Sequence, residues 1–113
     1  MEFKDLLNFI RIEEERLQKR FVYDDKEKRI LARTVKIAEE VGELCGEVLT
    51  FNSFQRKEKL NGHEQENLSE EFADVLFTTL LLARSMNIDI EKAMEAKMNK
   101  INKRYIVHTT DLV

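Results

Sequence analysis

The chain has 113 residues, of which 42% are hydrophobic, and this size and composition predict a single domain with a modest core. Its 19 basic and 22 acidic residues give a net charge of −3, so we expect no polybasic surface for a nucleic-acid polymer or a membrane. Proline is absent and glycine occurs only three times, which favours long uninterrupted helices and an all-α fold.

The N-terminal segment predicts a helix from Phe3 to about Phe21. Its apolar residues recur at three- and four-residue steps, as one face of an amphipathic helix requires. These residues are Phe3, Leu6, Leu7, Ile10 and Leu17. Charged residues interrupt the segment, and it lacks both an unbroken apolar run and a small-residue cleavage site, so we expect a cytoplasmic protein.

A second, longer helix is predicted from Lys26 to about Phe51, with Asp25 capping its first turn. Gly42 and Gly46 lie one turn apart on it, and we expect another helix to make its closest approach there. Cys45 is the single cysteine of the chain, which excludes an intramolecular disulfide and a cysteine-based zinc cluster. We expect this thiol to be buried and inert.

The polar stretch that follows Phe51 predicts a loop up to Asn67, which forms a capping pattern with Glu70 at the start of a third helix. This helix is predicted over residues 68–86 and is apolar nearly all round. Neighbouring helices should therefore enclose most of it. A lone four-helix monomer offers too little surface for that.

The last predicted helix follows a stop at Asn87 and a cap at Asp89, and it continues at helical period to Tyr105. Residues 1–113 thus form one all-α domain. The segment 105–113 lacks a helical stripe and is predicted to be a flexible tail.

The second and third helices each carry a pair of carboxylates three residues apart, Glu40 with Glu43 and Glu71 with Asp74. This spacing places both members of a pair on one helix face, with their Cβ atoms roughly 5 to 6 Å apart. Apolar residues flank both pairs, so burial is expected. Partly buried carboxylates repel one another and require compensating cations.

Oxygen ligands of this kind suit Mg²⁺, with Mn²⁺ as an alternative, and no histidine lies among them. The simpler interpretation is that these acidic residues only solvate exposed helix faces. Glu47 continues the face of Glu40 and Glu43 by one turn, and a surface position is as compatible with its spacing as a role at the site.

The motif EExxE of residues 39–43, followed by EExxD of residues 70–74 and by the closing segment MNIDIEKAMEAKMNKINKRY, resembles the MazG family of all-α nucleoside triphosphate pyrophosphatases. The resemblance implies a four-helix bundle-like fold completed as a homodimer or homotetramer. It implies that Glu40, Glu43, Glu71 and Asp74 hold Mg²⁺, and that a nucleoside triphosphate is hydrolysed to the monophosphate and pyrophosphate. Housecleaning of the nucleotide pool is the expected role.

Candidate residues for the rest of the chemistry lie close to these motifs. Glu39 or Glu70 could orient the attacking water, and four residues of the last helix are candidates for binding the phosphates or the nucleotide: Lys97, Lys100, Asn102 and Arg104. Some relatives carry an asparagine at the position of Ile101, next to Asn102. The aromatic candidates for stacking on the base, which could equally be core residues, are Phe9, Phe21, Tyr23 and Phe54.

Two alternatives to this enzyme remain open: a helical interaction or regulatory protein without turnover, and a phosphoribosyl-ATP pyrophosphatase-like enzyme. A di-iron bundle would need a Glu-x-x-His motif, whereas the third residue after Glu40 is Glu43 and the third after Glu71 is Asp74. His63 and His108 lie in the predicted loop and tail, which disfavours the di-iron interpretation.

Overall fold

The computed structural model is all-helical over the residues that it describes, which confirms the predicted fold class. It describes the backbone of residues 1–23, 25–54 and 62–111, and the side chains of residues 1–23, 25–52 and 67–105. The helices are α1 (Phe3–Arg20), α2 (Lys26–Leu49), α3 (Gly62–Ser85) and α4 (Ile90–Asp111), with a short π-helix, η1 (Thr50–Phe54), after α2. No helix of the described chain is both long enough and apolar enough to span a bilayer.

The predicted starts of α1 and α2 are confirmed, and α2 ends at Leu49, two residues before the predicted Phe51. The backbone N–H of Glu2 donates to the Asp5 carboxylate over 2.9 Å at the start of α1, and Asp25 accepts from the N–H of Lys28 over 2.8 Å at the start of α2. Both bonds satisfy amides that a helix N-terminus leaves free.

The turn between α3 and α4 follows the predicted stop and cap. Asn87 has φ 57°, the N–H of Ile88 donates to the carbonyl of Ala83, and the N–H of Asn87 donates to that of Arg84. Paired bonds of this kind around a left-handed residue form a Schellman motif. Asp89 then accepts from the N–H of Lys92 over 3.1 Å, so α4 begins in a new direction.

Two boundaries differ from the prediction. The third helix begins at Gly62 rather than at residue 68, because the polar segment before Asn67 is rich in glutamate and glutamine, which are good helix formers. The last helix continues to Asp111, beyond Tyr105, since no glycine or proline ends it there. Flexibility of the 105–113 tail stays a prediction.

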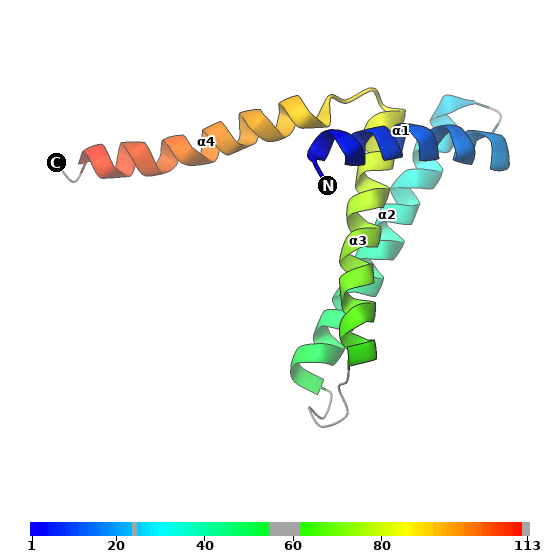
Figure 1. Ribbon diagram of the computed structural model, residues 1–113, viewed down its shortest axis with the longest axis horizontal. Helices are drawn as coiled ribbons and strands as arrows, with labels where there is room; N and C mark the ends of the chain where they lie inside the picture. Colours follow the sequence, from blue (N-terminus) through cyan, green and yellow to red (C-terminus); the bar gives the residue numbers. More distant parts are fainter. Residues whose placement is uncertain (24, 55–61, 112–113) are drawn as a thin grey trace.

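Three of the helices pack together, and α4 does not join them. α3 packs against both α2 and α1, with α2 and α3 antiparallel and α1 lying across their upper ends, while α4 extends away from all three (Figure 1). A four-helix bundle is therefore not closed within one chain, because the turn at Asn87 directs α4 outward.

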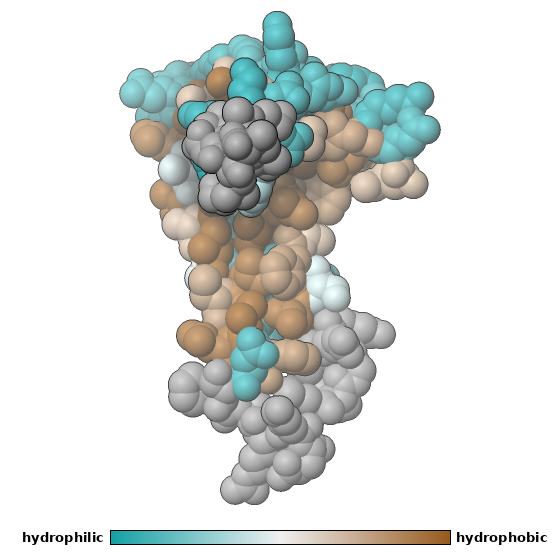
Figure 2. All heavy atoms as spheres, turned by 90° about the vertical axis from the view of Figure 1, so that its left-hand side faces the viewer, coloured by the Kyte–Doolittle hydropathy of each residue, from teal (hydrophilic) through white to brown (hydrophobic). Residues whose placement is uncertain are grey.

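Few apolar side chains are buried in a single chain. Ile10, at 2% exposure, is the one fully buried apolar side chain among those described, whereas Val35 on α2 is 67% and Leu76 on α3 is 64% exposed. Figure 2 shows apolar side chains gathered along α2 and α3 on the side towards which α4 extends. The prediction that neighbours enclose the third helix is thus not met within one chain.

The glycine and cysteine predictions were wrong for the single chain. A Cβ atom added at Gly42 or Gly46 would have no neighbouring atom within 4 Å, and Cys45 is exposed. None of the residues that the structure describes covers this part of α2.

Candidate active site

Carboxylates from α2 and α3 meet at one place between the two helices. One oxygen from each of Glu40, Glu43 and Glu71 lies within 4.8 Å of the others. We call these three residues the carboxylate cluster. The i, i+3 spacing on α2 aims Glu40 and Glu43 at the same place, and the antiparallel packing of α3 brings Glu71 to it.

Burial is uneven within the carboxylate cluster. Glu40 is only 7% exposed, Glu71 is half-buried, and Glu43 is open to solvent. One buried oxygen of Glu40 and one of Glu71, Oε2 in both, have no hydrogen-bond partner among the described residues. Because an unpartnered buried carboxylate oxygen is costly, these two atoms are suited to accept a cation.

The pKa of Glu71 also indicates that the carboxylate cluster is suited to a cation. Burial, together with the negative charges of Glu43, Asp74, Glu40 and Glu47, raises the pKa of the Glu71 carboxyl above its ordinary value of 4.5. A divalent cation with oxygen ligands would relieve this repulsion. The donor set therefore fits a hard cation such as Mg²⁺.

The structure places Asp74, the fourth predicted ligand, close enough to Glu71 to repel it electrostatically, but outside the three oxygens that lie within 4.8 Å of one another. Asp74 is half-buried. Glu47 is also half-buried and acts on Glu71 in the same way.

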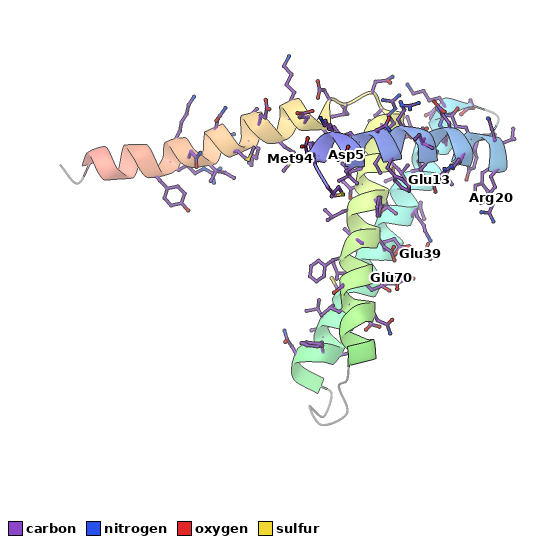
Figure 3. The ribbon with its side chains drawn as sticks, viewed as in Figure 1. Asp5, Glu13, Arg20, Glu39, Glu70 and Met94 are labelled. Carbon is purple, nitrogen blue, oxygen red and sulfur yellow. The ribbon has the colours of Figure 1, made fainter. Side chains whose placement is uncertain are left out.

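Glu39 and Glu70, the predicted water-orienting residues, are both exposed. Their side chains leave α2 and α3 at a similar height, on the side opposite to α4 (Figure 3). The Glu39 carboxylate lies 3.5 Å from the Lys36 ammonium.

Lys36 connects the carboxylate cluster with a cavity. Its Nζ lies 3.1 Å from Glu40 Oε1, and its pKa is raised by this hydrogen bond first and then by the charge of Glu39. The same side chain lines a cavity of about 450 Å³ between α1, α2 and α3. The other lining residues are apolar, aromatic or charged: Glu13, Leu17, Phe21, Tyr23, Ala32, Arg33, Thr78 and Leu81.

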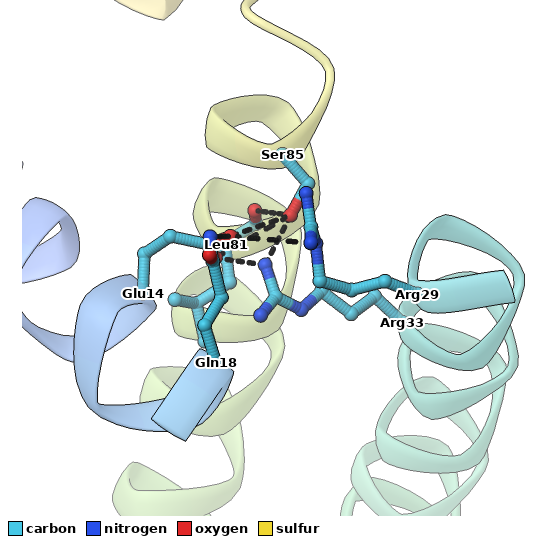
Figure 4. A network of polar contacts seen from close by, with 6 residues as sticks. All are labelled: Glu14, Gln18, Arg29, Arg33, Leu81 and Ser85. Atoms are coloured by element: carbon cyan, nitrogen blue, oxygen red, sulfur yellow. Dashed lines mark hydrogen bonds and ion pairs between the residues drawn. The ribbon is translucent and has the colours of Figure 1, made fainter. Parts of the chain in front are cut away.

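A network of polar contacts joins α1 to α2 and α3 (Figure 4), and its residue Arg33 also lines the cavity. The Glu14 carboxylate is buried and accepts from Arg33 and from Gln18, the latter over 2.8 Å, and it lies 3.8 Å from Arg29. Arg33 also donates to the Ser85 hydroxyl on α3. Burial lowers the pKa of the Arg33 guanidinium. The network thus anchors the cavity wall on α1.

Comparison with known proteins places this arrangement in a family. A family model described as the MazG nucleotide pyrophosphohydrolase domain matches residues 28–106. The chain belongs to the MazG family. The resemblance drawn from the two acidic motifs is confirmed, and nucleotide pyrophosphohydrolysis is the activity that membership implies.

A relative supports the match without adding an activity. The uncharacterized protein YpjD of Bacillus subtilis (strain 168) is 36% identical over 74 residues, which are 66% of this chain and 65% of that protein. No solved structure matches the chain significantly. The MazG match begins at residue 28, so the part of the cavity formed by α1 and by the connection after it precedes the matched segment.

The candidate substrate-binding residues of the MazG closing segment lie on the helix that extends away from the carboxylate cluster within one chain. Lys97, Lys100, Asn102 and Arg104 all belong to α4, which extends away from α2 and α3. Of the aromatic candidates, Phe21 and Tyr23 line the cavity, whereas Phe9 contacts the Phe77 ring at 5.6 Å. The side chain of Phe54 lies outside those described.

Sequence reasoning missed Lys36 and the Glu14 network. Lys36 stands four residues before Glu40, which puts it on the same helix face, and this spacing was the available signal. Glu14 and Arg33 gave none, since they are 19 residues apart and meet only through packing.

Proposed function

We propose that this MazG protein is a Mg²⁺-dependent nucleoside triphosphate pyrophosphohydrolase that converts an NTP or dNTP and water to the monophosphate and pyrophosphate, in housecleaning of the nucleotide pool. Family membership supports the reaction class. The observation that carries the proposal is the carboxylate cluster with its unpartnered buried oxygens.

Glu40, Glu43 and Glu71 would hold the metal, with Asp74 completing the acidic set; Mn²⁺ is an alternative ion. Bound Mg²⁺ supplies positive charge that offsets the triphosphate and stabilises the departing pyrophosphate. The protein's own part is to position these charges and to orient a water molecule. Glu39 or Glu70, exposed residues that directly precede Glu40 and Glu71 in the sequence, would accept the proton of that water.

The water oxygen then forms a bond to the α-phosphorus, and the bond from that phosphorus to the α,β-bridging oxygen breaks. Pyrophosphate leaves with the electron pair. The cavity beside Lys36 is the proposed place for the base, because Phe21 and Tyr23 offer it aromatic surfaces.

The proposed enzyme is a homodimer or homotetramer. α4 carries Lys97, Lys100, Asn102 and Arg104 away from its own cluster, so these residues would reach the phosphates of a nucleotide bound to a second copy. An apolar face on α2 and α3 that one chain leaves uncovered supports such an assembly.

The test is a panel of nucleotides, including phosphoribosyl-ATP, incubated with Mg²⁺ and analysed for both phosphate and pyrophosphate. In ¹⁸O-labelled water the label should enter the monophosphate. An α,β-methylene analogue should resist cleavage, whereas a β,γ-methylene analogue should be cut. Orthophosphate released in the first turnover, with a diphosphate left behind, would refute the proposed bond cleavage.

Replacement of the ligands tests the site itself. Glu43→Gln and Asp74→Asn should each lower turnover at least about 100-fold. Substitution of a residue that only contacts a metal ligand already lowers metal affinity or activity by about 10–100-fold. The matched control is Glu15→Gln, an exposed glutamate of α1 whose partner is Arg11. Unchanged turnover in both site variants, or an equal loss in the control, would exclude the assigned site. If Mg²⁺ neither stabilises nor activates the protein, the non-catalytic helical alternative is favoured.

A further inference from the structure

Lys36 occupies the position where the cavity and the carboxylate cluster adjoin. Its ammonium contacts Glu40 Oε1 at 3.1 Å and Glu39 Oε2 at 3.5 Å, and the same side chain lines the cavity with Phe21 and Tyr23. Among the described basic residues it is the one seen in an ion pair with the carboxylate cluster. With 52% of its side chain exposed, it is not fixed in place by packing.

We propose that Lys36 is a substrate-contacting residue, which leaves Glu40 when a divalent ion binds the carboxylate cluster and then binds the polyphosphate of the nucleotide. The inference rests on the proposed function, which supplies the ion and the triphosphate. Lys36 would thus supply a positive charge to the phosphates from α2 of the same chain, in addition to the residues of α4 proposed to come from a second copy.

The two oxygens of Glu40 support this exchange. Oε1 contacts Lys36, whereas Oε2 is buried, unpartnered and close to Glu43 and Glu71. In the metal-free protein the ammonium therefore supplies part of the missing positive charge. A divalent ion held by the same carboxylates would repel the ammonium and weaken its attraction to Glu40.

The displaced ammonium has an anionic partner within reach. A lysine side chain moves its charge on four flexible carbons, and this one is half-exposed. A nucleotide with its base in the cavity and its phosphates at the carboxylate cluster must pass Lys36, since that side chain belongs to both surroundings. A phosphate oxygen there would accept a charge-assisted hydrogen bond.

A purely structural role for Lys36 explains less. Its pairs with Glu39 and Glu40 have lysine on the N-terminal side, which is the weaker orientation for such pairs on a helix. Exposed ion pairs add little to stability. Such a role would leave the nucleotide affinity unchanged on replacement.

The experiment compares Lys36→Met, Lys36→Arg and the surface control Lys4→Met, whose lysine pairs with Glu2 far from the cavity. Titration calorimetry measures Mg²⁺ binding to the nucleotide-free protein, and then binding of an α,β-methylene triphosphate in saturating Mg²⁺. Lys36→Met should bind Mg²⁺ roughly threefold to tenfold more tightly, because a neighbouring positive charge is removed. It should bind the nucleotide analogue at least about tenfold more weakly.

Opposite changes in the two affinities, with the nucleotide affinity regained in Lys36→Arg and both unchanged in Lys4→Met, would establish the exchange. Equal affinities in Lys36→Met and the unaltered protein, or a parallel loss of both, would overturn it. If the unaltered protein hydrolyses nucleotides while Lys36→Met binds both partners normally, the Lys36 inference alone fails. If the unaltered protein binds neither Mg²⁺ nor nucleotide, the proposed function fails and the inference with it.

Discussion

Glu71 combines partial burial with like-charged neighbours on two helices. Its pKa is raised by burial first and then by Glu43, Asp74, Glu40 and Glu47. A carboxyl of this kind binds its proton more tightly in the folded state than in the unfolded chain. Its contribution to stability is therefore greatest at low pH, and it is lost as the pH rises from about 4.5 through the raised pKa.

Glu71→Gln should remove the destabilisation that the charged carboxylate causes above its raised pKa. In metal-free buffer the variant should be more stable than the unaltered protein at neutral pH, and the difference should vanish as the pH falls below about 4. Thermal unfolding in a chelator across this pH range measures the effect. Added Mg²⁺ should reverse the order at neutral pH, because only the unaltered protein keeps the full ligand set. A variant less stable at neutral pH without metal would show that Glu71 forms a favourable structural contact instead.

Single-residue geometry was predictable where it depends on one helix. The spacing of Glu40 and Glu43 fixes their common face, and the apolar residues around Glu71 indicated burial. Which of these three glutamates is most buried depends on how α3 packs on α2. The spacing within each helix holds no information on that, so the exposure of Glu43 and the contact of Lys36 with Glu40 could not be derived.

Helix limits were predictable where a local capping signal marks them. Asp25, Asn87 and Asp89 act at the expected positions because their bonds involve residues only a few positions away. The polarity of the segment before Asn67 predicts a loop, and this prediction is wrong for the start of α3. Glutamate and glutamine are polar and yet favour helices, and α3 begins at Gly62.

α1 is attached to the other helices by the Glu14 network as well as by apolar contacts with α3. Glu14→Gln would remove the buried carboxylate that the half-buried Arg33 and Arg29 share. Breaking one partner of a buried ion pair costs about 3–5 kcal/mol, and we expect a loss of this size in the free energy of unfolding. Urea denaturation followed by circular dichroism provides the measurement.

The neighbouring glutamate provides the control for this element. Glu15 pairs with Arg11 at 3.1 Å on the exposed side of α1. Glu15→Gln should change the free energy of unfolding by less than about 1 kcal/mol. Equal effects of the two substitutions would mean that the network does not hold α1 in place.

The whole chain is more extended than its length requires. Its radius of gyration is 18.5 Å, whereas a compact chain of this size would have about 13 Å. α4 protrudes, and apolar side chains on α2, α3 and α4 are exposed, among them Val35, Leu76 and Met98. So little burial does not stabilise a monomer of this size.

We therefore expect a dimer or tetramer at micromolar concentration in light scattering. Leu76→Lys should shift the population towards smaller species and lower the melting temperature, because its apolar side chain would lie in the interface. Lys92→Met, an exposed change near the start of α4, is the control. A stable monomer with full activity would contradict both the assembly and the role assigned to α4.

For the whole molecule, the sequence indicates that a second chain is needed, but it does not indicate which surface that chain would cover. The apolar circumference of the third helix predicts neighbours on most sides, and within residues 1–23, 25–54 and 62–111 the structure leaves Phe72 and Leu76 of this helix exposed. Gly42 and Gly46 were expected to lie against another helix, yet both face open space. Periodicity identifies an apolar face, whereas the element that covers it depends on packing between chains.

The left-handed turn at Asn87 has a consequence for how such a protein can change over evolution. Residues 86–89 alone separate the helix that carries Glu71 and Asp74 from the helix that carries the basic residues. A change of backbone at Asn87 would redirect α4 without altering any carboxylate. The proposed ion binding and the proposed reach of α4 towards a second copy could thus diverge independently, the first by replacement of side chains and the second by a different turn of four residues.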